Sequence, residues 1–283
     1  MKTLLPTSTA GSLPKPAWLA EPEKLWSDWK LQGEELAQGK QDALRVSLHD
    51  QRLAGIDIVS DGEMSKISYA TYIKDRITGF DGDSDRQPPS DLEEFPVFLQ
   101  RQASSGGTPT YRRPCCVGAI EVKDMGPVSD DIDNMRAALA KHVPSEGFMN
   151  AASPGVIALF QPNRHYPSHK DYLEAVADAM AHEYRAIVEA GLILQLDSPD
   201  LGLGRHMLFK DKSDEEYHSL ASEHVTALNQ ALEGIPKDRV RLHVCWGNYE
   251  GPHHHDAPME IVLPIALQAK VGGLNMHDLA REV

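Results

Sequence analysis

Short apolar strands alternate with longer amphipathic helices along this 283-residue chain, and this alternation predicts an α/β protein of the (β/α)8 TIM-barrel type. Alternating strands and helices build a mainly parallel sheet with helices outside it. Polar and ionisable residues recur at the carboxyl ends of successive predicted strands, where barrel enzymes place their active sites. The sequence shows no glycine-rich phosphate loop between a strand and a helix, which counts against a Rossmann or P-loop protein.

The predicted strands span residues 3–12, 56–60, 115–122, 148–157, 192–196, 240–244 and 271–276. The predicted helices span residues 34–54, 130–142, 168–190, 213–233 and 257–270. Residues 80–112 are rich in Asp, Pro, Ser, Gly and Arg, so we interpret them as an irregular excursion within a single domain of residues 1–283. The repeat amounts to about six and a half strand–helix units. We therefore expect a barrel that lacks its last one to two units.

Composition narrows the class of protein. The net charge of −14 argues against a nucleic acid or an anionic membrane surface as partner. An apolar run of about 18 residues is absent, which excludes a membrane-spanning helix, and the first residues lack the apolar core of a signal peptide. Three cysteines give no disulfide framework. The sequence predicts a cytoplasmic protein that acts on small molecules.

The strand at residues 240–244 carries the most informative pair of side chains. His243 and Cys245 are two residues apart, so on an extended strand both point to the same face. An imidazole and a thiolate that converge at the end of a strand suit a soft divalent metal, above all zinc. The alternative is a buried His and a buried Cys that share a face of the core.

Carboxylates follow two other predicted strands. Asp61-Gly62-Glu63 comes directly after residues 56–60, and Asp197 ends the strand at 192–196. Gly11-Ser12 forms a turn after the first strand. Parallel strands bring their carboxyl ends to one edge, so these groups are candidate site residues. A solvated turn is the alternative for each of them.

With these residues assembled, the chain resembles the cobalamin-independent methionine synthases, and most closely the short single-barrel members that correspond to the catalytic C-terminal half of the long enzyme. The resemblance covers most of residues 3–273. The residues that carry it are Gly11-Ser-Leu-Pro14, Asp61-Gly-Glu63, Gln195-Leu-Asp-Ser-Pro199 and His243-Val-Cys-Trp-Gly-Asn-Tyr-Glu-Gly-Pro-His-His-His-Asp256.

The resemblance implies a zinc-dependent methyl transfer to the thiol of homocysteine, as in a 5-methyltetrahydropteroyltriglutamate–homocysteine S-methyltransferase. It implies that His243 and Cys245 bind Zn²⁺ and that the zinc holds the substrate thiol as a thiolate. By the same resemblance, Glu63 and Asp197 hold the amino group of homocysteine, and the turn at Gly11 and Ser12 binds its carboxylate.

The sequence departs from the family pattern near its end. The family completes its zinc site with a glutamate after the next strand and with a second cysteine, but residues 271–277 contain no glutamate and no cysteine follows Cys245. His277 is a candidate substitute by its position. The run His253-His-His255 could supply a ligand too, but we favour a role in solvent or behind the ligands. We expect an open barrel edge, which favours association with a second copy of the chain.

Two other functions fit these residues. One is a zinc-dependent thiol alkyltransferase or lyase of the same superfamily, acting on an epoxide or a coenzyme-M-like thiol, which would not need Glu63 and Asp197. The other is a non-catalytic barrel remnant, which the missing ligands favour.

Overall fold

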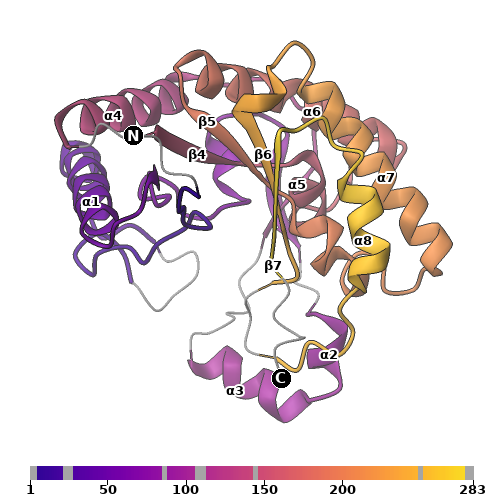
Figure 1. Cartoon of the computed structure of the whole chain (residues 1–283). Helices are drawn as coiled ribbons and strands as arrows, with labels where there is room; N and C mark the ends of the chain where they lie inside the picture. The colour runs from indigo at the N-terminus through magenta and orange to yellow at the C-terminus, as the bar shows by residue number, and fades with distance from the viewer. Residues whose placement is uncertain are drawn as a thin grey trace.

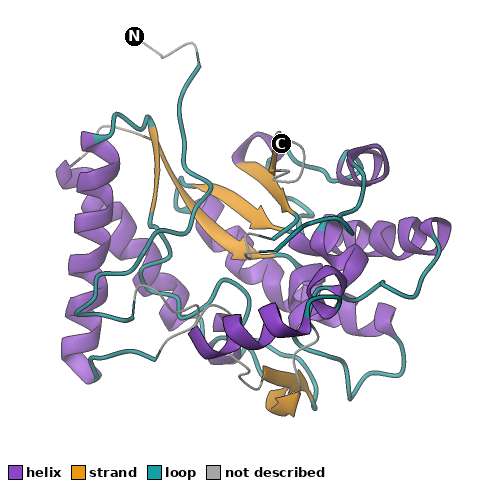
Figure 2. Cartoon of the chain, turned by 90° about the horizontal axis from the view of Figure 1, so that it is seen from below, coloured by secondary structure: helices purple, strands orange, loops and turns teal. Residues whose placement is uncertain are grey.

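The computed structural model describes residues 5–21, 28–84, 88–105, 113–142, 146–247 and 251–277. Helices surround a central group of strands in this part of the chain (Figure 2). None of the described helices combines the length and the apolar character that crossing a membrane requires.

A curled parallel sheet forms the centre of the structure (Figure 1). Its spatial order in the described residues is β1-β4-β5-β6-β7, and each neighbouring pair is parallel. The strands are β1 (Ile58–Ser60), β4 (Glu146–Ala152), β5 (Ile193–Asp197), β6 (Val240–Cys245) and β7 (Gly273–His277). The sheet is a partial barrel, as the alternation of strands and helices predicts.

Helices cover the outside of this sheet (Figure 1). They are α1 (Gly33–Leu53), α4 (Gly126–His142), α5 (Pro154–Phe160), α6 (His169–Glu189), α7 (Asp214–Ala231) and α8 (Met259–Ala266). Ser168 and Ser213 cap α6 and α7 by accepting hydrogen bonds from backbone N–H groups of the first turn. Both helices therefore begin within a residue of the predicted start. Short 3₁₀ turns lie at η1 (Tyr72–Asp75), η2 (Pro199–Leu201), η3 (Leu203–His206) and η4 (Lys237–Arg239).

Two predicted strands are shorter than expected. The strand predicted over 148–157 ends at Ala152, because Ser153 caps α5 and Pro154 occupies the first turn of that helix. In the described part of residues 3–12, the only bridge to the sheet is Ser8 with Ile58. Thr7 fixes this segment, since its backbone N–H and its hydroxyl both donate to Asp57 Oδ2 at 2.8 and 2.9 Å.

The strand predicted over 115–122 is the main error. The structure has β3 (Arg113–Cys116) instead, paired antiparallel with β2 (Phe80–Ser84) and outside the parallel sheet. The chain leaves β3 at once, because the N–H groups of residues 117 and 118 both donate to the carbonyl of Gly79. Residues 80–112 are therefore more regular than expected, since they also include α2 (Ser90–Glu93) and α3 (Pro96–Ser105).

A buried ion-pair network joins the segment after η1 to the helices α4 and α6. Arg76 follows η1 and pairs with Asp131 of α4 and with Glu183 of α6, the second at 2.9 Å. Tyr72 donates its hydroxyl proton to Glu183 at 2.8 Å. These contacts give Glu183 a structural role, and His182 beside it is exposed.

We expect Arg76→Met to lower the free energy of unfolding by about 3–5 kcal/mol, because it leaves buried carboxylates without their cation. Arg45→Met is the matched control, since the ion pair of Arg45 with Asp42 is exposed and such pairs contribute about 0–1 kcal/mol. Urea denaturation of both variants measures the difference. Equal losses would show that the buried network does not stabilise the fold.

Candidate active site

A cavity of about 330 Å³ opens at the carboxyl ends of the parallel strands. Side chains from the N-terminal turn, from the loop after β1 and from β4, β5, β6 and β7 line it. The lining residues are Ala10, Ser12, Glu63, Tyr69, Asn150, Asp197, Pro199, His243, Cys245, Gly247 and Asn275. Five predicted site residues, Ser12, Glu63, Asp197, His243 and Cys245, thus face one space.

The sixth predicted residue, Gly11, shapes the turn beside the cavity. Its φ is +135°, and a Cβ atom there would lie 2.2 Å from Asn150 Nδ2. Only glycine permits both this backbone conformation and this close approach. The carbonyl of Gly11 accepts a hydrogen bond from Ser60 Oγ at 3.1 Å, and that of Ala10 accepts one from Gln195 Nε2 at 2.6 Å. The turn is therefore held against β1 and β5, and Ser12 is exposed to the cavity.

Glu63 is held in the cavity by an unusual backbone. Its φ is +58°, which is rare for a residue with a side chain and is often found at functional sites. The preceding turn is fixed by two hydrogen bonds, from the N–H of Gly62 to Ser60 Oγ and from the N–H of Glu63 to Asp61 Oδ1. Burial, and then repulsion from Asp197, raise the pKa of Glu63 to about 7.

Asp197 is the second buried carboxylate of the cavity. Asn150 Nδ2 donates to its Oδ2 at 2.8 Å, and Gln195 Nε2 donates to its Oδ1 at 3.0 Å. Burial raises the pKa of Asp197, while His243 and these two amides oppose the rise. Both oxygens are thus fixed in direction, and the site has two carboxylates that a bound cation would stabilise.

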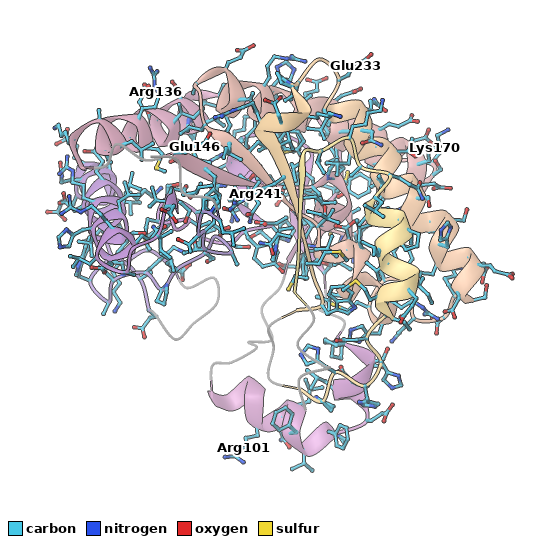
Figure 3. All side chains as sticks on the ribbon, in the orientation of Figure 1. Arg101, Arg136, Glu146, Lys170, Glu233 and Arg241 are labelled. Atoms are coloured by element: carbon cyan, nitrogen blue, oxygen red, sulfur yellow. The ribbon has the colours of Figure 1, made fainter. Side chains whose placement is uncertain are left out.

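Arg241 orients the amide of Gln195 from the other side. Its Nε donates to Gln195 Oε1 at 2.8 Å, which turns the NH₂ group of Gln195 toward Asp197. The guanidinium lies 3.8 Å from the ring centroid of Phe148. Figure 3 shows Arg241 among the strands, unlike Lys170 and Glu233 on the outside. The predictions missed Asn150 and Arg241, although a polar residue inside the apolar stretch 148–152 is a signal for the first.

Lys66 supplies a buried positive charge behind the carboxylates. Its Nζ donates to the carbonyl of Asn150 and lies 4.4 Å from the ring centroid of Tyr72. It is 2% exposed, and its charge lowers the pKa values of Glu63 and Asp197 against the larger effect of burial. A single lysine therefore offsets part of the repulsion between two acids.

His243 and Cys245 are the candidate metal ligands. Both are on β6, whose side chains alternate between buried and half-buried, and both line the cavity. Cys245 Sγ accepts a hydrogen bond from the N–H of Gly247 at 3.1 Å, and burial raises the pKa of the thiol. In the strand register His243 lies between Asp197 of β5 and Asn275 of β7.

An imidazole and a thiol on one face fit two positions of a zinc site. Within the part of the chain that the structure describes, no third His, Cys, Asp or Glu joins them in a group whose ligand atoms all lie within 4.8 Å of one another. Opposite Cys245 in the register is His277, whose side chain is outside the described residues. His254 and His255 line a different pocket, so they do not complete this pair.

The curated relatives and the solved structures that resemble this chain agree on one family. No family model matches the chain. It is 29% identical over 250 residues to a methionine synthase of Sulfurisphaera tokodaii and 30% identical over 249 residues to one of Saccharolobus solfataricus. Each alignment covers 87% of this chain, and 63% or 64% of the relative. The chain thus spans less than two thirds of the length of these curated relatives.

Solved structures give the same result. A B12-independent methionine synthase from a Shewanella species, in complex with selenomethionine, superposes with a TM-score of 0.68 at 33% identity, covering 87% of this chain and 62% of that one. By sequence and by structure, the chain is similar to the B12-independent methionine synthases over most of its own length. A protein from Listeria monocytogenes, described as a putative B12-independent methionine synthase, is 17% identical with a TM-score of 0.53, and this likeness shows the fold alone. The predicted resemblance and the predicted fold are both confirmed.

We expect Gly11→Ala to destabilise the fold by about 1–3 kcal/mol more than Gly191→Ala, because the added methyl group must displace Asn150. Gly191 is the matched control, since its φ is +85° and nothing lies within 4 Å of an added Cβ atom. Urea denaturation of the two variants measures the contrast. If both lose the same stability, the backbone conformation alone matters and the contact with Asn150 does not.

The raised pKa of Glu63 makes stability depend on pH. The folded state holds the proton up to about pH 7 and the unfolded state only to about 4.5, so this carboxyl reduces stability as the pH rises between these values. Glu63→Gln has no such proton to lose. We therefore expect the free energy of unfolding of the variant, minus that of the parent, to be larger at about pH 8 than at about pH 5.

Urea denaturation at both pH values tests this expectation, with the exposed Glu233→Gln as control. A difference between Glu63→Gln and the parent that is the same at both pH values would contradict the raised pKa.

Proposed function

We propose that the cavity binds an amino-acid thiol and that the protein takes part in methyl transfer to it, from homocysteine to methionine. The observation that carries the proposal is the pair of buried carboxylates, Glu63 and Asp197, facing the same cavity as an imidazole and a thiol. The relative from Shewanella, solved with selenomethionine, supports a ligand of this kind.

Each end of such a substrate has a complementary group. The ammonium group suits the two carboxylates. Burial has raised the pKa values of both carboxyl groups, and a bound cation would lower these pKa values toward their usual range. The carboxylate suits the exposed hydroxyl of Ser12 and the backbone of the N-terminal turn. The sulfur would then lie toward β6.

Zinc, if bound, would be held by His243 and Cys245 and would keep the substrate sulfur as a thiolate, the nucleophilic form. In the transfer, a bond forms between sulfur and the methyl carbon while the bond from that carbon to the donor breaks. The thiol gives its proton to solvent before attack, and the donor, which keeps the electron pair of the broken bond, takes up a proton in turn. Asp197 lies beside His243 in the sheet and lowers the cost of positive charge there.

The same observation separates this function from its alternatives. A thiol alkyltransferase for an epoxide or a coenzyme-M-like thiol has no ammonium group to bind, so it gains nothing from two buried acids that repel each other. Burying such groups without a partner is unfavourable. The carboxylates therefore favour an amino-acid thiol.

We expect Glu63→Gln to weaken homocysteine binding about tenfold or more, since a charged partner of the ammonium group is lost, while zinc content stays unchanged. His243→Ala/Cys245→Ala should lower the zinc content by one ion per chain. Elemental analysis and calorimetric titration with homocysteine measure the two properties, and Glu233→Gln is the control. Equal losses of zinc and thiol affinity in Glu63→Gln would contradict the role given to Glu63.

An assay with homocysteine and a methylated folate follows on the parent chain. Turnover that depends on His243 and Cys245 supports the proposal. Stoichiometric zinc without thiol binding would refute it and favour a non-catalytic barrel.

A further inference from the structure

A second group of metal-ligating side chains lies where α2 meets the loop after β6 (Figure 1). Glu94, the C-cap residue of α2, faces His254 and His255 of that loop. His254 Nε2 is 3.0 Å from Glu94 Oε2, and His255 Nε2 contacts Glu94 Oε1. One ligand atom from each residue lies within 4.8 Å of the other two. Among the described residues, this is the only such group of three.

Neighbouring side chains usually diverge, so the turn that brings two consecutive imidazoles together needs support. His253 supplies it with a φ of +54°. The N–H of His253 donates to Asp91 Oδ2 at 2.9 Å, and His253 Nδ1 is 3.0 Å from Asp256 Oδ2. Asp91 and His253 are buried. The exposed pair of histidines is therefore fixed on a buried frame, and their ring centroids are 4.2 Å apart.

The donor set has a specific chemistry. Two imidazole nitrogens and one carboxylate are ligands that zinc and neighbouring transition metals bind at about 2.0–2.2 Å. Two ligands of a tetrahedral zinc are then roughly 3.4 Å apart, and the ligand atoms here all lie within 4.8 Å of one another. The fourth position would be left to water. The negative net charge of the chain, −14, also favours a cation.

We propose that Glu94, His254 and His255 form a binding site for a divalent transition metal, best suited to Zn²⁺, separate from His243 and Cys245. His254 and His255 line a different pocket from the one that His243 and Cys245 line. A metal here ties α2, part of the excursion between β2 and β3, to the loop that follows Cys245. It would therefore steady the loop that leads away from Cys245 and Gly247, which line the cavity, without lining the cavity itself.

The competing interpretation is a surface cluster in which the histidines hydrogen-bond to Glu94 and bind no ion. Such exposed pairs contribute little to stability. A measurement of metal binding to these three residues distinguishes the two interpretations.

The test measures Zn²⁺ affinity by competition with a chromophoric chelator, using the full chain without a polyhistidine tag. In the His243→Ala/Cys245→Ala background, we expect one Zn²⁺ per chain. Adding His254→Ala/His255→Ala should weaken that binding by about 100-fold or more, and adding Glu94→Gln by about tenfold. His165→Ala/His218→Ala, which removes two exposed histidines elsewhere, is the matched control and should change nothing.

The same histidine pair is also changed in the otherwise unaltered chain, so that the result does not depend on how the background variant folds. There the Zn²⁺ content should fall by one ion per chain while the ion that depends on His243 and Cys245 stays. No Zn²⁺ binding at tens of micromolar in the background, or equal affinity in the His254/His255 variant and the control, would overturn the proposal.

Discussion

The site depends on keeping two carboxylates, Glu63 and Asp197, in one buried cavity. Burial raises the pKa of both groups, and repulsion from Asp197 raises that of Glu63 further, so the arrangement is unfavourable by itself. Most of the surrounding polar structure offsets that cost. Lys66 brings a buried positive charge, while Asn150 and Gln195 donate to Asp197.

The support for Asp197 continues beyond the residues that touch the cavity. Arg241 fixes the amide of Gln195, and Gln195 in turn holds both Asp197 and the carbonyl of Ala10. One glutamine thus ties the carboxylate to the turn that carries Gly11 and Ser12. The close approach of Gly11 to Asn150 joins the same turn to the second amide that holds Asp197. A polar network of this kind specifies one geometry, because any unmade hydrogen bond would leave a buried group unsatisfied.

The loop after β6 links the cavity to the excursion between β2 and β3. His243 and Cys245 are on the strand itself, and ten residues after His243 the buried His253 is anchored to Asp91 of α2. The Trp246 indole is buried and donates to the carbonyl of Ala257 at 2.7 Å, which holds the loop against the start of α8. Residues that a sequence pattern marks as irregular are therefore anchored to the loop that follows the two candidate metal ligands.

The sequence by itself determined the fold class and the principal helices, since hydrophobic periodicity and capping residues are local signals. The resemblance to a known family came from its motifs, such as Asp61-Gly-Glu63. It also determined that Ser12, Glu63, Asp197, His243 and Cys245 face one space, because parallel strands bring their carboxyl ends together. Only the tertiary structure decided that residues 113–116 pair antiparallel with β2, since the partner of a strand is set by contacts distant in sequence. It alone decided the roles of Asn150 and Arg241 and the convergence of Glu94 with His254 and His255. Those contacts join residues that are 46 to 161 positions apart, and no local pattern encodes such distances.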